Sequence, residues 1–262
     1  MEGEDAQKAL REVGFHFRYR VKVSMRIAAT ADIHSPLYLE QFKLSLEALD
    51  KVDLFLLAGD LVLKNQIQEL ERVLSAIRKV YQGPILSCFG NEEYEQDWEK
   101  YLAFGEMEWL EGRARVLETR EGKVAIAGSK GSLDRPTFWQ RRNVPGIWKT
   151  YAERVNVLDS ILADIKAEIK IVLTHYSPTY RTLEGERESA WPEMACKKLE
   201  RVIESRQPDV WIHGHAHRGK VPSLYIGKTL LLNVSFPARG SIVVFEVPRR
   251  TGLDLFLSTA PG

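Results

Sequence analysis

Histidine, aspartate and asparagine residues gather where short apolar stretches of this sequence end. The chain has 6 histidines, and all but His16 stand in such a position. The stretches read ATADIH, LLAGD, CFGN, IVLTHY and VWIHGHAH, and they supply Asp32, His34, Asp60, Asn91, His175, His213, His215 and His217. Side chains of these types, brought together, would bind metal ions.

The mixture of imidazole and carboxylate favours particular metals and a particular reaction. Such ligands suit Zn, Mn, Fe, Co or Ni. A bridging carboxylate can hold two such ions roughly 3.5–4 Å apart, and the pair then clamps the attacking and leaving oxygens of an in-line phosphoryl displacement. The ions also lower the pKa of bound water, so that hydroxide forms at neutral pH. We expect two divalent cations, Mn²⁺ first, with Fe, Zn, Ni or Co as alternatives.

The elements that must position these residues alternate between strand and helix. Apolar stretches predict strands at residues 26–30, 52–58, 84–89, 170–174 and 209–213. Apolar residues at helical spacing predict helices at 36–49, 66–81, 148–165 and 192–205. Further strands are expected at 115–118, 123–128, 224–226, 229–233, 241–247 and 253–257. Because open α/β sheets bind ligands at the carboxyl ends of their strands, the side chains named above should meet at one rim.

Five short motifs, taken together, resemble the calcineurin-like metallophosphoesterase family. They are DIH (32–34), GD (59–60), GN (90–91), TH (174–175) and GHAH (214–217), and they occur in the family's order between residue 26 and the early 240s. Each motif alone is weak, whereas the ordered set is specific. The resemblance implies an α/β fold, a four-layer α/β/β/α sandwich of two mixed sheets flanked by helices.

The resemblance also implies a role for each ligand. Asp32, His34 and His217 would bind one metal ion. Asn91, His175 and His215 would bind the other, and Asp60 would bridge both. Asn91, Glu92 and His175 are the expected catalytic residues. The expected activity is hydrolysis of a phosphodiester, or of an activated phosphate ester, of a small molecule or nucleotide by metal-activated hydroxide.

The third motif departs from the family pattern. The family usually has GNH followed by an acidic residue, whereas this chain has Gly90-Asn91-Glu92-Glu93. The resemblance is then to small prokaryotic, especially archaeal, phosphoesterases of the GNEE type. A histidine there can protonate a leaving alkoxide, but a glutamate beside two divalent cations should be ionised and unable to do so. Glu92 therefore predicts a preference for diesters with good leaving groups.

Two further classes of function stay open beside the enzyme. The fold could be a non-catalytic scaffold that binds protein partners, although a complete ligand set argues against it. It could also be a nuclease, which the balance of 37 Lys+Arg against 36 Asp+Glu disfavours without excluding.

Composition bounds the setting. Cys88 and Cys196 form no CxxC pair, which makes a disulfide scaffold or a cysteine zinc site unexpected. The charged N-terminus has no apolar segment typical of a secretory leader, and no apolar run is long enough to span a bilayer. We expect a cytoplasmic protein that acts on a phosphate ester without a membrane partner, and homo-oligomerisation stays open.

We divide the chain into an N-terminal extension, residues 1–24, and a metallophosphoesterase domain, residues 25–262. Between residues 15 and 23 apolar and basic side chains alternate, which is typical of a one-sided strand. This segment is either an added edge strand or translated sequence upstream of a true start at Met25.

Several of these residues also have ordinary structural interpretations. Asp32 and Asp60 could cap helices, and strand alternation turns His213 away from its neighbours. Cys88 is expected to be a buried small residue. Trp139 and Trp191 could stack on a substrate base near the rim. Lys130, Arg135, Arg141 and Arg142 could screen an anionic substrate or form a solvated face.

Overall fold

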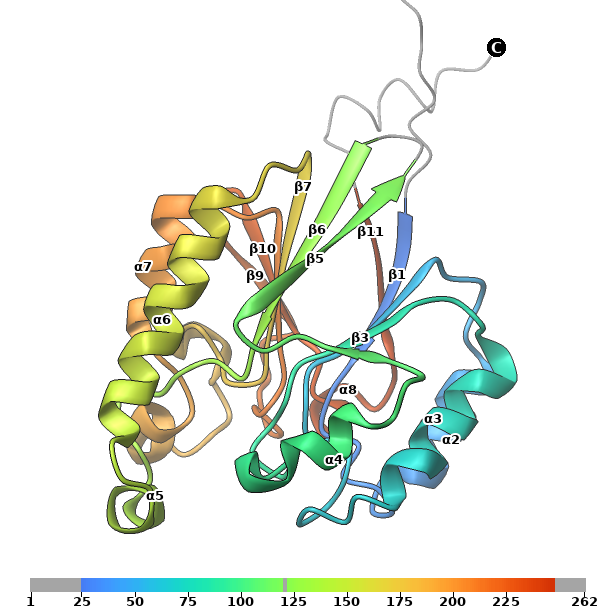
Figure 1. Ribbon diagram of the computed structural model, residues 1–262, viewed down its shortest axis with the longest axis horizontal. Coiled ribbons are helices and arrows are strands. Elements are labelled where there is room, and N and C mark those ends of the chain that lie inside the picture. Colours follow the sequence, from blue (N-terminus) through green and yellow to red (C-terminus); the bar gives the residue numbers. More distant parts are fainter. Residues whose placement is uncertain (1–24, 120–121, 248–262) are drawn as a thin grey trace, which may run out of the picture.

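The computed structural model describes residues 25–119 and 122–247, and these form two β-sheets packed face to face between two layers of helices. Figure 1 shows the layers edge on, with α6 and α7 on one outer side and α2 and α3 on the other. The expected four-layer sandwich is confirmed. The expected strands at 15–23 and 253–257 lie outside the described residues.

The first sheet has five strands in the order β11-β1-β2-β3-β4. Their bounds are β1 Met25–Thr30, β2 Leu54–Leu57, β3 Ile85–Ser87, β4 Glu108–Trp109 and β11 Val243–Val247. Strands β1 to β4 run parallel, and β11 pairs antiparallel with β1. Because strand side chains alternate between faces, Phe55 and Leu57 pack toward the helices while Leu54 and Leu56 face the other sheet.

Two helices cover the outer face of this sheet, α2 Leu39–Glu47 and α3 Glu69–Val80. In α3, Leu70, Val73, Leu74 and Ile77 are buried, so the helical spacing of these residues forms the stripe that meets the strands. The helix expected to begin at Pro36 begins at Leu39 instead, because Leu37 and Tyr38 donate their backbone N–H groups to His34 and Ile33 in turns that precede the helix.

The second sheet has six strands in the order β5-β6-β7-β8-β10-β9. Their bounds are β5 Arg113–Thr119, β6 Gly122–Ser129, β7 Ile169–Thr174, β8 Val210–His213, β9 Ser223–Ile226 and β10 Thr229–Asn233. The four inner strands run parallel, and β5 and β9 close the sheet antiparallel at its edges. Helices α6 Ile147–Asp164 and α7 Lys197–Arg206 cover its outer face over Trp211 and Leu231.

Short elements join the parallel strands at the rim where their carboxyl ends lie. They are the 3₁₀ turns η1 Glu95–Asp97, η2 Tyr180–Thr182 and η3 Glu188–Glu193, and the helices α4 Trp98–Leu102, α5 Phe138–Asn143 and α8 Phe236–Arg239. The helix expected at 192–205 is divided there: Pro192 lies inside η3, and α7 begins at Lys197 after an extended Cys196. None of the helices in the described ranges is both long and apolar enough to cross a membrane.

Backbone hydrogen bonds join the two sheets at this rim. The backbone N–H of Ala31, just after β1, donates to the carbonyl of Val234, just after β10, and the N–H of Phe236 donates to the carbonyl of Ala31. Gly214 lies in the same contact, where an added Cβ would stand 2.5 Å from the Cβ of Ala31. The close approach therefore needs glycine at this position, and it brings the loops of both sheets together.

Candidate metal centre

The candidate ligands lie in loops that follow β1, β2, β3, β7 and β8, at the rim where the two sheets meet. Asp32, Asp60 and His175 are at most 1% exposed, and His34 is 6% exposed. Ionisable side chains are rarely this buried unless they are paired or bind a metal ion. The rim expected from the sequence is therefore present, and it holds polar side chains away from water.

Each aspartate uses one carboxylate oxygen to accept a backbone N–H and presents the other to histidines. Asp32 Oδ2 accepts from the N–H of His215 at 2.9 Å, and Asp60 Oδ1 accepts from the N–H of Glu92 at 2.8 Å. The second oxygens lie 3.2 Å from His217 Nε2 for Asp32 and 3.4 Å from His175 Nε2 for Asp60. The backbone thus orients both carboxylates and leaves one oxygen of each directed at the centre.

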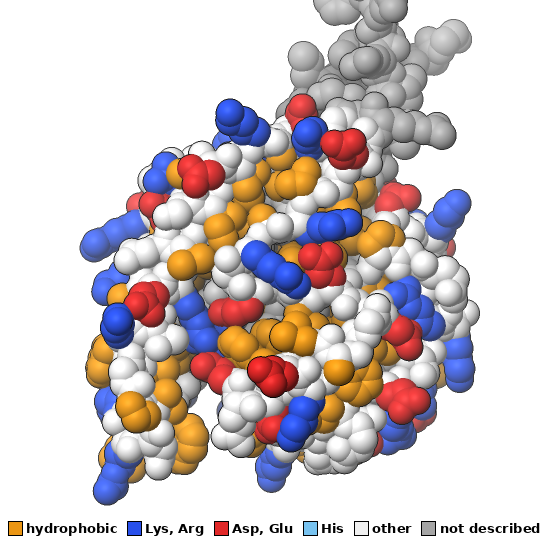
Figure 2. Space-filling model, in the orientation of Figure 1, with side chains coloured by type: hydrophobic (Ala, Val, Ile, Leu, Met, Phe, Trp, Pro, Cys, Tyr) orange, Lys and Arg blue, Asp and Glu red, His pale blue; other side chains and the backbone are white. Residues whose placement is uncertain are grey.

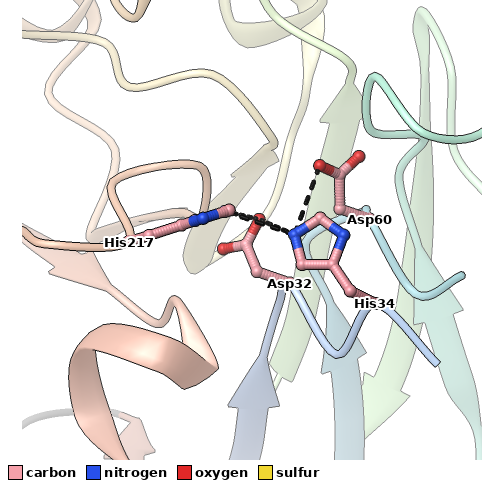
Figure 3. Close-up of side chains that lie close together, drawn as sticks. All are labelled: Asp32, His34, Asp60 and His217. Atoms are coloured by element: carbon pink, nitrogen blue, oxygen red, sulfur yellow. Dashed lines mark hydrogen bonds and ion pairs between the residues drawn. The ribbon is translucent and has the colours of Figure 1, made fainter. Parts of the chain in front are cut away.

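One group that could hold a cation comprises Asp32, His34, Asp60 and His217 (Figure 3). Its ligand atoms all lie within 4.8 Å of one another. His34 Nε2 is 3.8 Å from Asp60 Oδ2 and 3.3 Å from His217 Nε2. Two carboxylates and two imidazoles at this spacing match the preferences of Mn, Fe or Zn.

A second group that could hold a cation comprises Asp60, His175 and His215. His175 Nδ1 lies 2.9 Å from the carbonyl oxygen of Ala58, so it must carry a proton and donate it. In the neutral ring Nε2 then has a lone pair, yet it faces Asn91 Oδ1 at 3.0 Å as well as Asp60. Acceptors that face one another need a cation between them, either a proton or a metal ion.

The ionisation of these residues follows from burial opposed by neighbouring charge. Burial raises the pKa of Asp32, but its hydrogen bond to His217 and the surrounding histidines hold that pKa well below its usual range. For His175 burial lowers the pKa, and the charge of Asp60 overcomes this and raises the pKa to about 9. Burial lowers the pKa of His215 to about 3, which keeps this ring neutral and able to bind a metal ion.

Two buried polar atoms of the two groups have no hydrogen-bond partner among the described residues. They are His34 Nδ1 and His215 Nδ1. Burying a polar atom unpaired costs on the order of 1–3 kcal/mol, so such a cluster needs a ligand to balance it. The donor set, the facing acceptors and these atoms together fit divalent cations.

A comparison of the sequence with models of protein families points to the same kind of site over most of the chain. The family model of calcineurin-like phosphoesterases matches residues 25–219. The chain belongs to this family. No curated protein matches the sequence.

Solved structures share the fold of this calcineurin-like phosphoesterase. Phosphopantetheinyl hydrolase from Mycobacterium tuberculosis superposes with a TM-score of 0.64 at 15% identity, over 91% of this chain and 99% of the other. A Thermus thermophilus protein, TT1561, gives 0.54 at 16% identity, over 86% of this chain and 100% of the other. A putative 5'-nucleotidase from Staphylococcus aureus gives 0.57 at 11% identity, over 80% and 48%. At these identities the likeness shows the fold alone.

The ligand loops of this phosphoesterase adopt a backbone conformation that side chains rarely take. Asp32, His34, Asp60 and His215 have φ values of 59°, 43°, 54° and 66°. Non-glycine residues with such left-handed φ cluster at functional sites, where the surrounding structure holds them in place. Their conformation turns each side chain from the end of its strand back toward the centre.

Glu93 is an important residue whose role sequence reasoning missed. Its carboxylate is fully buried and accepts backbone N–H groups of Asp60, Leu61 and Gly90 at 2.7–2.9 Å, and that of Val62 at 3.4 Å. Burial, and then the charge of Asp60, raise the pKa of Glu93 to about 7. The residue holds the Asp60 loop against the loop that carries Asn91.

Glu92, the neighbouring acid, is only partly buried. Its carboxylate accepts the backbone N–H of Lys64, and its other oxygen lies 3.4 Å from Asn91 Nδ2. It therefore joins two rim loops, and through Asn91 it also lies next to the second group.

The other residues singled out from the sequence lie outside the two ligand groups. His213 belongs to neither ligand group, and Cys88 is fully buried as expected. The basic residues do not form one cluster: Lys130 is buried and lies 3.4 Å from Glu95, whereas Arg135 and Arg141 approach Glu193 at 3.0 and 3.8 Å. Trp191 is partly buried against Tyr180, while Trp139 is exposed.

Proposed function

We propose that this chain hydrolyses phosphodiesters, or activated phosphate esters, of a small molecule or nucleotide at a centre of two divalent cations. The observation that supports two ions is that the two ligand groups share Asp60 and otherwise differ. Asp32, His34 and His217 would hold one ion, and His175, His215 and Asn91 the other. Mn²⁺ is the ion we propose first, with Fe, Zn, Ni or Co as alternatives.

The protein's own residues contribute orientation. When bound, the two cations would offset the charge of the phosphate and lower the pKa of water in the site. The backbone N–H groups of His215 and Glu92 fix the carboxylates of Asp32 and Asp60, and Ala58 fixes the ring of His175. Such fixed geometry reduces the reorganisation needed when charge develops in the transition state.

Glu92 supports the preference for diesters. A carboxylate beside Asn91 should repel the dianion of a phosphomonoester more than the monoanion of a diester. One Glu92 oxygen accepts the Lys64 N–H and the other faces Asn91 Nδ2, so we assign Glu92 no role as the acid that protonates a leaving alkoxide. We therefore propose activity on aryl diesters and weak activity on alkyl monoesters.

The decisive experiment is a metal-by-substrate screen on protein first stripped with a chelator. Mn²⁺, Fe²⁺, Zn²⁺, Ni²⁺ and Co²⁺ are each added back, and turnover is measured on aryl diesters, aryl and alkyl monoesters, cyclic nucleotides and single-stranded nucleic acid. Bound metal is measured separately by elemental analysis. Two equivalents with diester turnover support the proposal, whereas fewer than one equivalent under all conditions rejects the dinuclear centre.

Two variants separate the parts of this proposal. Asp60→Ala removes the residue common to both groups, so it should lose activity and metal together. Glu92→His should raise turnover most for poor leaving groups, by roughly 10²–10⁴-fold if a general acid is restored. Equal effects on good and poor leaving groups would reject the assigned role of Glu92. Full metal binding without turnover on any ester would instead favour a scaffold.

A further inference from the structure

Helix α5 and the start of α6 expose three aromatic side chains. Phe138 and Trp139 are 63% and 65% exposed, and Trp148, at the start of α6, is 56% exposed. We call residues 138–149 the aromatic corner. Single exposed apolar residues are ordinary on protein surfaces, but a local group of large aromatics marks a site of interaction.

The aromatic corner carries an excess of positive charge. The sequence of the corner has three cations, Arg141, Arg142 and Lys149, and no acidic residue. Two of them approach carboxylates outside the corner: Arg141 lies 3.8 Å from Glu193, and Lys149 lies 3.5 Å from Glu153. The Arg142 guanidinium lies 5.3 Å from the centre of the Phe138 ring, so a cation sits directly on the exposed aromatic.

The aromatic corner lies on the same side of the molecule as the metal centre. Leu133, Ile147 and Tyr151 below it form a small core with Tyr176, which adjoins His175. Figure 1 places α5 at the lower left tip of the molecule, and Figure 2 shows orange and blue side chains there. Leu37 and Tyr94, in the loops after β1 and β3, are 55% and 42% exposed on the same rim.

We propose that the aromatic corner docks this phosphoesterase on a membrane surface that carries anionic lipid. Tryptophan and other aromatics prefer the interface between headgroups and acyl chains, and neighbouring Arg and Lys bind anionic headgroups. Because no described helix spans a bilayer, the docking is peripheral. The proposal differs from the expectation of no membrane partner, which rests on the absence of a spanning segment. A linear sequence does not show which aromatic side chains are exposed.

Two other occupants fit the corner less well. A second copy in a two-fold contact would place the same patch against itself, which opposes like charges. A single strand of nucleic acid is bound in a positively charged groove lined by aromatics, whereas this corner is a projecting tip in Figure 2. An anionic bilayer matches both the charge and the convex shape.

The test is flotation of the full chain with lipid vesicles, which requires neither metal nor substrate. Vesicles of phosphatidylcholine alone are compared with vesicles that are about one third phosphatidylglycerol, at low and high salt. The double variant Phe138→Ala/Trp148→Ala removes two of the three exposed aromatics and leaves Trp139, a candidate for stacking on substrate, in place. Leu44→Ala/Tyr225→Ala is the matched control, because these side chains are 66% and 56% exposed on α2 and β9, away from the rim.

We expect the wild-type chain and the control to float with anionic vesicles, with weaker binding at high salt. The double variant should bind at least about tenfold more weakly, with unchanged turnover on a water-soluble aryl diester. No flotation of the wild-type chain, or equal flotation of the double variant, would overturn the proposal. Two other results would overturn it if the wild-type chain does not bind vesicles. One is a wild-type dimer that dissociates in the double variant, and the other is binding of the wild-type chain to a labelled oligonucleotide. Turnover on the soluble ester reports on the proposed function separately.

Discussion

The buried carboxylate of Glu93 should contribute more to the free energy of unfolding than the half-buried carboxylate of Glu92. Glu93→Gln keeps the shape but replaces one oxygen by an NH₂ group, which then faces backbone N–H groups of the Asp60 loop or of Gly90. We expect a loss of about 1–3 kcal/mol in the free energy of unfolding. Urea denaturation measures it, and a metal titration should show weaker binding because Asp60 moves.

Glu92→Gln is the control for this substitution. Its carboxylate accepts one backbone N–H near the surface, so the change should cost less than about 1 kcal/mol. Equal unfolding midpoints for the two variants would contradict the role assigned to Glu93.

At the scale of residues, the motifs predicted the candidate ligands but not the residues that hold the ligand loops in place. Asp32 and His217 lie far apart in the sequence, yet their motifs and the order of the motifs predicted that both lie at one rim. The role of Glu93 was hidden because two adjacent glutamates look alike in a sequence. Which of them faces inward depends on backbone N–H groups from another loop, and a sequence does not show those.

Among the elements, the turn after β3 leaves no room for a side chain at Gly90. A Cβ there would stand 2.1 Å from Asp60 Oδ1 and 2.3 Å from the Asp60 backbone nitrogen. Gly90→Ala should therefore displace Asp60 and abolish activity, and it should lower the free energy of unfolding by about 1–3 kcal/mol.

Gly105→Ala is the matched control for Gly90→Ala. Gly105 also follows a short element, and nothing lies within 4 Å of an added Cβ. Its turnover and its unfolding midpoint should stay close to those of the wild-type chain. Full activity of Gly90→Ala would show that the Asp60 loop can shift without loss of function.

The elements that the sequence predicted are those with several turns or a long apolar run. The strands β1, β2, β7 and β8 and the helices α3 and α6 are confirmed within a few residues. The elements α4, α5, α8 and β4 were missed, because a strand of two residues or a helix of four to six is too short to show a period. These short elements form the rim, so the aromatic corner could not be foreseen.

At the scale of the whole molecule, Arg154 joins the two halves of the sandwich. This buried side chain on α6 donates to Glu95 at 2.8 Å and to Glu111 at 3.1 Å. Glu95 lies in η1, between β3 and β4 of the first sheet, and Glu111 lies between β4 and β5, where the chain passes to the second sheet. Arg154→Ala should cost about 3 kcal/mol in the free energy of unfolding, because it removes the ion pair of Glu111 and leaves Glu95 with Lys130 alone.

Arg206→Ala is the control for this pair of charges. Arg206 and Asp159 form a good ion pair at 2.7 Å, but both are well exposed. Exposed pairs contribute about 0–1 kcal/mol. Urea denaturation of the two variants compares them directly, and similar losses would mean that Arg154 does not join the halves as described.

A chain that starts at Met25 should keep its metal binding and its turnover on an aryl diester. Every candidate ligand lies after this residue, and β1 begins at it. Elemental analysis and an activity assay on the shortened chain test this expectation. Loss of metal from a folded shortened chain would show that residues 1–24 contribute to the site.

The sequence predicted the layers of the molecule but not how its strands are ordered. Alternating strands and helices indicate an α/β protein, and the resemblance supplied the sandwich. The pairing of β11 beside β1, and of β10 beside β8, joins strands distant in sequence. Packing between the sheets determines which strands become neighbours, and a single sequence contains no local signal for that packing.

The left-handed backbone of the ligand residues has a consequence for how this fold could change over generations. Asp32 has a φ of 59°, where glycine is at ease and a residue with a Cβ is strained by about 1–2 kcal/mol. Asp32→Gly and Asp32→Ala both remove the carboxylate, yet the glycine variant should be more stable by about 0.5–1 kcal/mol. Thermal or urea unfolding of the pair would show it, and a more stable alanine variant would exclude this strain. If the difference holds, a lineage released from catalysis would be more stable with glycine than with alanine at such a position, so that lost ligands would be replaced preferentially by glycine.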